Sequence, residues 1–235
     1  MINEIQTLTD KCTKVLALKE ASLPDEYFYQ SLPLCIVDAV FSIGVRYTSV
    51  QNIVSRFCEF TGQTKIRSCS LIPNINDQYS VEDFCMMQEQ SNPNLMAESV
   101  YKNRHRTSPK NGVLKAQATY EFAKCLKKYG VNYFQDLHKV IDDVNFSNEI
   151  KKIKGQTSGV SLQYFWMLAG SESLIKPDRM IIRFISNSLS REIKIEEALS
   201  LLQKVSVKLQ TEYPRITPRL LDYKIWEYQR EINNA

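Results

Sequence analysis

The chain has 235 residues, of which 43% are hydrophobic and 24% charged, and this balance excludes wholesale disorder. A formal net charge of +4 permits an anionic partner without requiring one. No basic leader precedes an apolar stretch, and the apolar runs are too short to cross a bilayer. We therefore expect a cytoplasmic protein without a membrane partner.

The cysteines predict neither a metal centre nor a redox pair. The 6 cysteines occur singly, and neither of the 2 histidines is spaced from a cysteine as zinc ligands are. Most cysteines sit in apolar patterns, where a free thiol behaves as a small hydrophobic group. We expect structural thiols, no metal and no cofactor.

Apolar residues recur at helical spacing along most of the chain, for example over 5–16, 50–57 and 199–209. Ser80 and Pro93 are typical helix starts, and good helix formers over 113–129 end at Gly130. Period-two alternation is nearly absent, so the fold class is all-α, with roughly eleven short helices. The segment 61–79 is expected to be an irregular surface connection.

A glycine-bounded turn precedes the apolar segment that begins near residue 160. Its residues include Gly155, Thr157, Ser158 and Gly159. Unpaired amides at a helix N-terminus suit a phosphate, because the helix dipole is positive there. The turn is neither a Walker loop, which needs a lysine and a hydroxyl residue, nor a dinucleotide fingerprint, which needs a preceding strand. On these residues alone a plain turn between two helices is the favoured interpretation.

Two aspartates stand in informative contexts. Asp178, in "IKPDRMIIRF" (175–184), is typical of a helix N-cap, worth roughly 1 kcal/mol. The alternative is a catalytic carboxylate, if the fold brings it beside the glycine turn. Asp38 lies in the apolar run 35–40, where a carboxylate is costly unless it is hydrogen-bonded or functional. A polar edge, or a cap on a neighbouring helix, explains Asp38 equally well.

Two further segments suit nucleic acid. The turn 44–47 carries one cation, Arg46, and one aromatic ring, Tyr47, a pair that can enter a groove or simply lie in solvent. The run 101–116 has no acid and contains Lys102, Arg104, His105, Arg106, Lys110 and Lys115. Such a run is typical of contact with a phosphate backbone and also of a solvated face.

The order and spacing of these segments resemble the helix-hairpin-helix DNA glycosylases of the endonuclease III and 3-methyladenine glycosylase superfamily. "DAVFSIGVRYTSVQNIVSRF" is similar to the family's helix with a DNA-inserting turn, and "SPKNGVLKAQATYEFAKCL" to the loop and helix start that follow. "IKGQTSGVS" resembles the hairpin, "IKPDRMIIRF" the segment of the catalytic aspartate, and "LLDYKIWEYQRE" the closing helix. The resemblance covers most of the chain, in order.

The resemblance implies two helical lobes with the site between them. Residues 31–170 would form a six-helix barrel ending in the hairpin, and residues 1–30 plus 171–235 the second lobe. Amides of the turn 155–159 would hold a phosphate of double-stranded DNA, often with a monovalent cation, while Arg46 and Tyr47 invade the duplex. The target base would flip out, and Asp178 would stabilise the cationic sugar. Asp38 would be a general acid or a base-reading group.

Three departures from the family pattern limit the type of glycosylase activity that we expect. No lysine occurs over 155–175, so the Schiff-base lyase route looks closed. The second hairpin glycine is replaced by Thr157 or displaced to Gly159, and no cysteine follows Cys125 to hold an iron–sulphur cluster. We expect a monomeric, monofunctional DNA N-glycosylase, associated with the nucleoid when bound to DNA. The alternatives are a catalytically inactive DNA-binding relative and a helical protein-interaction module.

Overall fold

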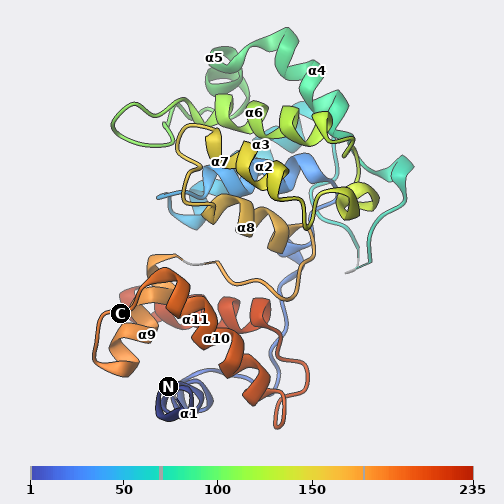
Figure 1. Ribbon diagram of the computed structural model, residues 1–235. Coiled ribbons are helices and arrows are strands. Elements are labelled where there is room, and N and C mark those ends of the chain that lie inside the picture. The colour runs from blue at the N-terminus through green and yellow to red at the C-terminus, as the bar shows by residue number, and fades with distance from the viewer. Residues whose placement is uncertain (1, 69–70, 177, 235) are drawn as a thin grey trace. The chain divides into compact units, whose positions relative to one another are not determined.

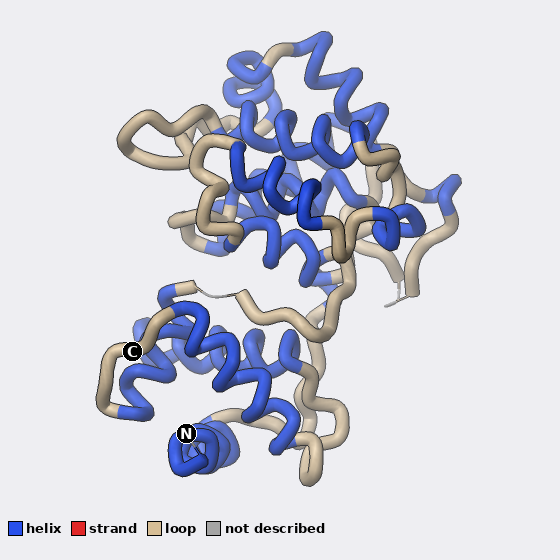
Figure 2. Tube along the Cα trace, in the orientation of Figure 1, coloured by secondary structure: helices blue, strands red, loops and turns tan. Residues whose placement is uncertain are grey.

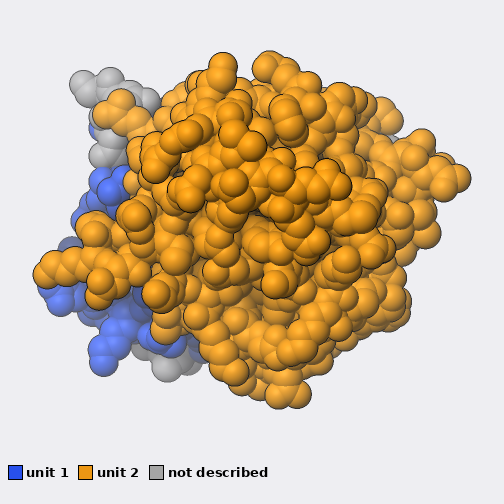
Figure 3. Space-filling view, turned by 90° about the horizontal axis from the view of Figure 1, so that it is seen from above, with its two compact units in different colours: residues 1–24, 170–235 blue, residues 25–169 orange. Residues whose placement is uncertain are grey.

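The computed structural model describes residues 2–68, 71–176 and 178–234, and this part of the chain consists of helices joined by loops and turns (Figure 1, Figure 2). No strand forms within it; Tyr29 with Ile66 and Arg106 with Leu114 make isolated antiparallel bridges. The predicted all-α class is therefore confirmed. The chain divides into two compact units, unit 1 (residues 1–24 and 170–235) and unit 2 (residues 25–169), coloured separately in Figure 3.

Unit 2 is built around one buried helix. Its elements are η1 (Asp25–Tyr27), α2 (Leu32–Phe41), α3 (Tyr47–Thr61), η2 (Ile75–Asp77), α4 (Val81–Ser91), α5 (Pro93–Leu95), the π-helical η3 (Met96–Val100), α6 (Lys115–Lys128), η4 (Phe134–Lys139), α7 (Val144–Lys152) and α8 (Val160–Leu168). Every residue of α2 is buried, and the helix packs against α3, α6 and α8. An almost wholly apolar sequence makes this central position favourable.

Local signals determine several boundaries in unit 2. The side chain of Ser80 accepts a hydrogen bond from the Asp83 amide at 2.9 Å and starts α4, as predicted. The helix predicted over 113–129 is α6, after which Gly130 adopts a left-handed φ of 72°. The connection predicted over 61–79 is irregular apart from η2 and exposes Leu71 and Ile72. Residues 69 and 70 lie outside the described residues.

Unit 1 joins the N-terminal helix to the C-terminal helices. Its elements are α1 (Ile2–Val15), α9 (Arg179–Leu189), α10 (Ile195–Leu209) and α11 (Pro218–Asn234). Helix α1 packs against α9 and α10, and α11 packs against the same two. A core that includes Leu8, Cys12, Ile185, Leu202 and Ile225 fills the centre. The predicted stripes of 5–16 and 199–209 supply much of this core, so their periodicity reflects burial.

Candidate nucleic-acid interface

The glycine turn of unit 2 connects helices α7 and α8. The amide of Gln156 donates to the Ile153 carbonyl, and that of Gly159 to the Gln156 carbonyl, each at 2.9 Å. Gly159 occupies the N-cap of α8 with a φ of 72° and makes no side-chain cap hydrogen bond. The Val160 amide makes a long contact of 3.5 Å with Ser158 Oγ, so the first turn of α8 has only this weak side-chain acceptor among the described residues. A site for an outside anion requires amides that are free or weakly engaged in this way.

Gly155 packs closely against the loop formed by the basic run 101–114, here called the basic loop. Its φ is +87°, and a Cβ placed on it would lie 2.4 Å from the Cβ of Thr107. Thr107 is buried and belongs to the basic run 101–116. Only glycine fits such an approach, so two segments that were separate candidates in the sequence form one continuous region. We call this region, residues 101–114 together with 151–159, the basic platform.

The basic loop is an ordered hairpin-like structure. The Thr107 amide donates to the Val113 carbonyl and the Lys115 amide to the His105 carbonyl, both at 2.9 Å. Gly112 packs so closely that a Cβ there would lie 2.4 Å from the Ser108 backbone. The Arg106 Nη1 atom donates to the Gly112 carbonyl at 2.6 Å. The loop therefore presents its charges from a defined backbone.

The charges of the platform are exposed, with two qualifications. The side chains of Lys102, Arg104, Arg106, Lys110, Lys151, Lys152 and Lys154 are exposed. Arg104 forms an ion pair with Glu98, an acid outside the run, so this cation is partly compensated. Lys115 is 2% exposed and is no surface charge. Counting Lys115 as part of the basic surface was wrong, because its ammonium turns inward.

Lys115 instead holds the turn that carries Arg46. Its Nζ atom donates to the carbonyls of Phe41, at 2.9 Å, and Ile43, at 2.6 Å. A cation is favourable at this point, since the C-terminus of α2 presents unpaired carbonyls. Gly44 follows with a φ of 65°, and α3 begins at Tyr47. Arg46 is exposed at the N-cap of α3.

Tyr47 is held back in this structure. Its hydroxyl donates to Glu26 Oε1 at 2.6 Å, and its ring stacks on Tyr27 with the centroids 6.2 Å apart. Burial, followed by the nearby Tyr27 and Glu26, raises the pKa of Tyr47. Of the two residues predicted to enter the duplex, Arg46 is exposed to solvent, while the Tyr47 hydroxyl is engaged by Glu26.

Asp38 lies in the middle of unit 2 and is 1% exposed. Its Oδ2 atom accepts the hydroxyl of Tyr29 at 2.7 Å, and Tyr29 in turn accepts Gln51 Nε2 at 3.2 Å. Lys65 Nζ donates to Gln51 Oε1 at 2.6 Å. The Lys65 ammonium can only donate hydrogen bonds, so it determines the direction of every bond in this network. Gln51 donates to Tyr29, and Tyr29 donates to Asp38.

This direction bears on the role of Asp38. Burial, followed by the charge of Asp38, raises the pKa of Tyr29 well above its usual value, so the hydroxyl keeps the proton that it donates. Asp38 Oδ2 is therefore an acceptor. The arrangement describes a buried support that orients Tyr29, whereas a general acid must itself carry a transferable proton within reach of its substrate.

Asp178 lies in unit 1, where it caps α9. Its Oδ1 atom accepts the amides of Met180, at 2.8 Å, and Ile181, at 3.2 Å. The predicted N-cap is thus confirmed. Both bonds go to one oxygen, and Oδ2 accepts no hydrogen bond from the described residues, so the cap leaves half of the carboxylate for another partner. Pro177, the proline of the quoted motif, is outside the described residues.

A second carboxyl group, Asp222 on α11, is close to Asp178 and was missed in the sequence. Asp222 is 8% exposed, and its Oδ1 atom accepts the Lys176 amide at 3.0 Å. Burial, followed by the charge of Asp178, raises the pKa of Asp222 well above its usual value. An acid within the apolar stripe of a helix was the available signal, and it was the same signal that singled out Asp38.

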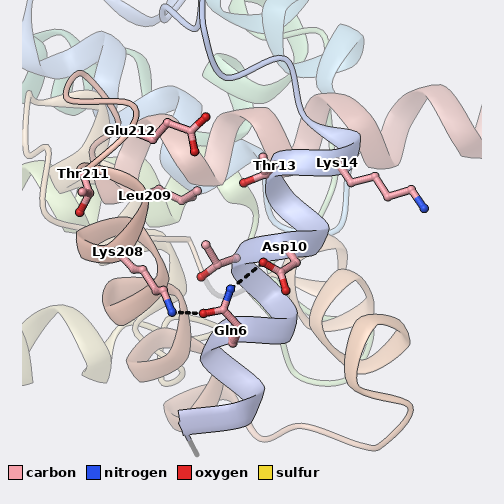
Figure 4. Close-up of a pocket in the computed structure, with 9 residues that line it drawn as sticks. Gln6, Asp10, Thr13, Lys14, Lys208, Leu209, Thr211 and Glu212 are labelled. Atoms are coloured by element: carbon pink, nitrogen blue, oxygen red, sulfur yellow. Dashed lines mark hydrogen bonds between the residues drawn. The ribbon is translucent and has the colours of Figure 1, made fainter.

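A shallow cavity of about 430 Å³ occurs in unit 1 between α1 and the end of α10 (Figure 4). Gln6 spans it, donating to Asp10 at 2.7 Å and accepting from Lys208. Thr13 and Glu212 also line it. It contains none of the predicted site residues, and Gln6, Asp10 and Lys208 in its wall bond to one another.

Two negative findings apply to the described part of the chain. Over residues 2–68, 71–176 and 178–234, no group of three or more His, Cys, Asp or Glu side chains could hold a metal ion. Within the same ranges, no helix combines the length and the apolar character needed to cross a membrane.

Comparison with known proteins places the chain in one family. Residues 6–230 match the family described as "Domain of unknown function (DUF8548)". The chain belongs to this family. No curated protein and no solved structure matches it. The basic platform and the Asp178 loop are therefore features of a DUF8548 domain, and a function for them has to come from their chemistry.

Proposed function

We propose that this DUF8548 domain is a monofunctional DNA N-glycosylase that excises a modified or damaged base. The close approach of Gly155 to Thr107 supports the proposal most strongly, because it joins a helix N-terminus whose N-cap residue has no side chain to a loop of exposed cations. Amides and cations of this kind together suit a DNA phosphate. Unit 2 then corresponds to the barrel lobe with its helix-hairpin-helix, and unit 1 to the second lobe.

In this proposal the basic platform binds the backbone of double-stranded DNA. The amides over 157–158 and 160–161 receive one phosphate at the N-terminus of α8, and Arg104 and Arg106 contact neighbouring phosphates. Arg46 enters the duplex at the vacated position, because the glycosidic carbon is reached only when the nucleotide leaves the stack. The protein works as a monomer, in the cytoplasm and on the nucleoid.

Asp178 supplies the chemistry in this proposal. Its Oδ1 atom accepts two amides, which fix the position of the carboxylate at the start of α9. A fixed carboxylate stabilises the positive charge that develops on the sugar as the base departs, and Oδ2 positions the attacking water. Water is the nucleophile here, since no lysine occurs over 155–175 to form a Schiff base.

Base release from defined duplexes tests the proposal. Duplexes that each carry one modified base are incubated with the protein, and alkali then converts abasic sites into strand breaks. We expect release on at least one lesion, abolished by Asp178→Asn, while DNA binding is retained. Asparagine still caps a helix, so the variant isolates charge from folding.

The second candidate is a DNA-binding relative without catalysis. It is favoured by the structural role that Asp178 already has as the cap of α9. Binding without release on every lesion would support this candidate. If binding at low salt is absent and is unchanged by Arg104→Glu with Arg106→Glu, both DNA-based functions are rejected, and a protein-interaction module remains.

A further inference from the structure

The segment between α8 and α9 is held at two points by the first turns of α11. At its start, Arg219 donates from its amide to the Glu172 carbonyl at 3.1 Å and from Nη1 to Glu172 Oε1 at 2.9 Å. Thr217 donates to the other Glu172 oxygen at 2.8 Å. Near its end, the Lys176 amide donates to Asp222 Oδ1 at 3.0 Å.

The second point lies two residues before Asp178. The Asp178 amide donates to the Lys176 carbonyl at 2.7 Å, so Lys176 is held by Asp222 through its N–H and holds the backbone of Asp178 through its carbonyl. Ile175, 2% exposed, anchors the same stretch in the core of unit 1. Further along, Arg183 Nε donates to Gln229 Oε1 at 2.8 Å and ties α9 to α11. A continuous series of hydrogen bonds thus connects α11 to Asp178.

We propose that Asp222 is a positioning residue for Asp178. Asp222 acts through the backbone of Lys176 and keeps the carboxylate of Asp178 on the amides of α9. Asp222 is buried on α11, and the Lys176 amide is the hydrogen-bond partner of its carboxyl group among the described residues. The bearing of this role on catalysis rests on the proposed function, whereas the positioning itself does not.

The protonation state of Asp222 determines the pH range in which Asp222 positions Asp178. Asp178 and Lys176 face Asp222 from the loop and Arg219 from its own helix, while Glu172 engages Arg219. Burial and the charge of Asp178 raise the pKa of Asp222 and exceed the opposing effects of Lys176 and Arg219. The neutral carboxyl group accepts the Lys176 amide, and an ionised Asp222 would place a second negative charge beside Asp178.

Two substitutions separate the hydrogen bond from the charge. Asp222→Asn keeps an oxygen for the Lys176 amide and can never ionise. Asp222→Leu has a similar shape and removes the acceptor. Asp143 provides an internal reference, because its Oδ1 atom caps α7 in the same way, accepting the amides of Asn145 at 2.7 Å and Phe146 at 3.0 Å.

Amide hydrogen exchange of the whole protein without DNA tests the proposal. In Asp222→Leu we expect the protection of the Met180 and Ile181 amides to fall about tenfold, the scale of one lost buried hydrogen bond, with Asn145 and Phe146 unchanged. In the native protein, protection at Met180 and Ile181 should fall at alkaline pH relative to Asn145 and Phe146. Asp222→Asn should abolish that fall.

Unchanged protection at Met180 and Ile181 in both variants, at every pH, would overturn the proposal. If Asp222→Leu does not fold, the comparison of Asp222→Asn with the native protein at alkaline pH decides alone. The two proposals fail separately: absence of base release on every lesion rejects the glycosylase function, and unchanged exchange rejects the positioning role. Where release is found, Asp222→Leu should lower the single-turnover rate and leave DNA affinity unchanged.

Discussion

The N-termini of α8 and α9 are built in opposite ways. Helix α8 starts at Gly159, which has no side chain to offer its amides, and it lies in a region of exposed cations. Helix α9 starts at Asp178, whose own carboxylate takes the first amides, beside a buried second carboxyl group. One terminus thus suits an anion from outside, and the other holds its own anion in place. In the proposed function, the first terminus binds a phosphate and the second stabilises a cation.

The largest effect on stability is expected at the α8 terminus, from Gly155→Ala. The added Cβ would lie 2.4 Å from that of Thr107, on a backbone with a φ of +87°. We expect the free energy of unfolding to fall by about 3 kcal/mol, from strain and overpacking together. Gly130→Ala is the matched control, because its φ is +72° but nothing lies within 4 Å of the new Cβ. Denaturant unfolding measures both, and equal losses would show that the contact with Thr107 is unimportant.

The next effect concerns the support of the Arg46 turn. Lys115→Met removes the donor of both the Phe41 and the Ile43 carbonyl. We expect a loss of about 2 kcal/mol in the free energy of unfolding, since a buried carbonyl and a part-buried one lose this donor. Lys110→Met, an exposed change in the same loop, should leave stability unaltered. A loss of the same size in Lys110→Met would contradict the inward role of Lys115.

DNA affinity offers a smaller test of the platform. Arg106→Gln and Lys152→Gln should each reduce the slope of log K against log salt by about 1, as expected for a lost phosphate contact. Lys19→Gln, an exposed cation of unit 1, is the control and should leave the slope as it is. Fluorescence anisotropy with a labelled duplex measures the slope. Identical slopes for all three variants would place the DNA elsewhere.

The smallest expected effect is a gain in stability of the Asp222→Asn variant over the native protein, which depends on pH. The pKa of Asp222 is raised in the folded protein, so its contribution to stability is complete below the unfolded pKa and is lost as the pH rises towards the folded one. Asp222→Asn removes this loss. Its Tm should exceed that of the native protein at pH 8, and the gap should close towards pH 4. A gap that widens on acidification would mean that the pKa of Asp222 is lowered instead.

Local chemistry made part of this structure predictable. Ser80 and Asp178 start helices because their side chains accept nearby amides, and the stripes of α1 and α10 reveal their buried faces. Each of these signals lies within a few residues of its effect. For the same reason the glycine turn could be placed between two helices.

Contacts between distant segments could not be predicted in this way. Gly155 meets Thr107, and Lys115 reaches Phe41, across long stretches of chain. The inward turn of Lys115 removed a charge that the sequence had assigned to the surface, and Glu98 compensates Arg104 from outside the basic run. Asp222 resembles Asp38 in the sequence, yet its importance depends on a neighbour, Asp178, that only the fold supplies.

Asp178 and Asp143 allow the most direct test of the central claim. Both cap a helix through one oxygen and two amides, and only Asp178 is proposed to act on DNA. Single-turnover base release should be measured for Asp178→Asn and Asp143→Asn on the lesion that the native protein releases fastest. We predict a loss of about a hundredfold or more for Asp178→Asn, on the scale of a removed electrostatic stabiliser, and native rates for Asp143→Asn. Equal rates in the two variants would contradict a catalytic Asp178.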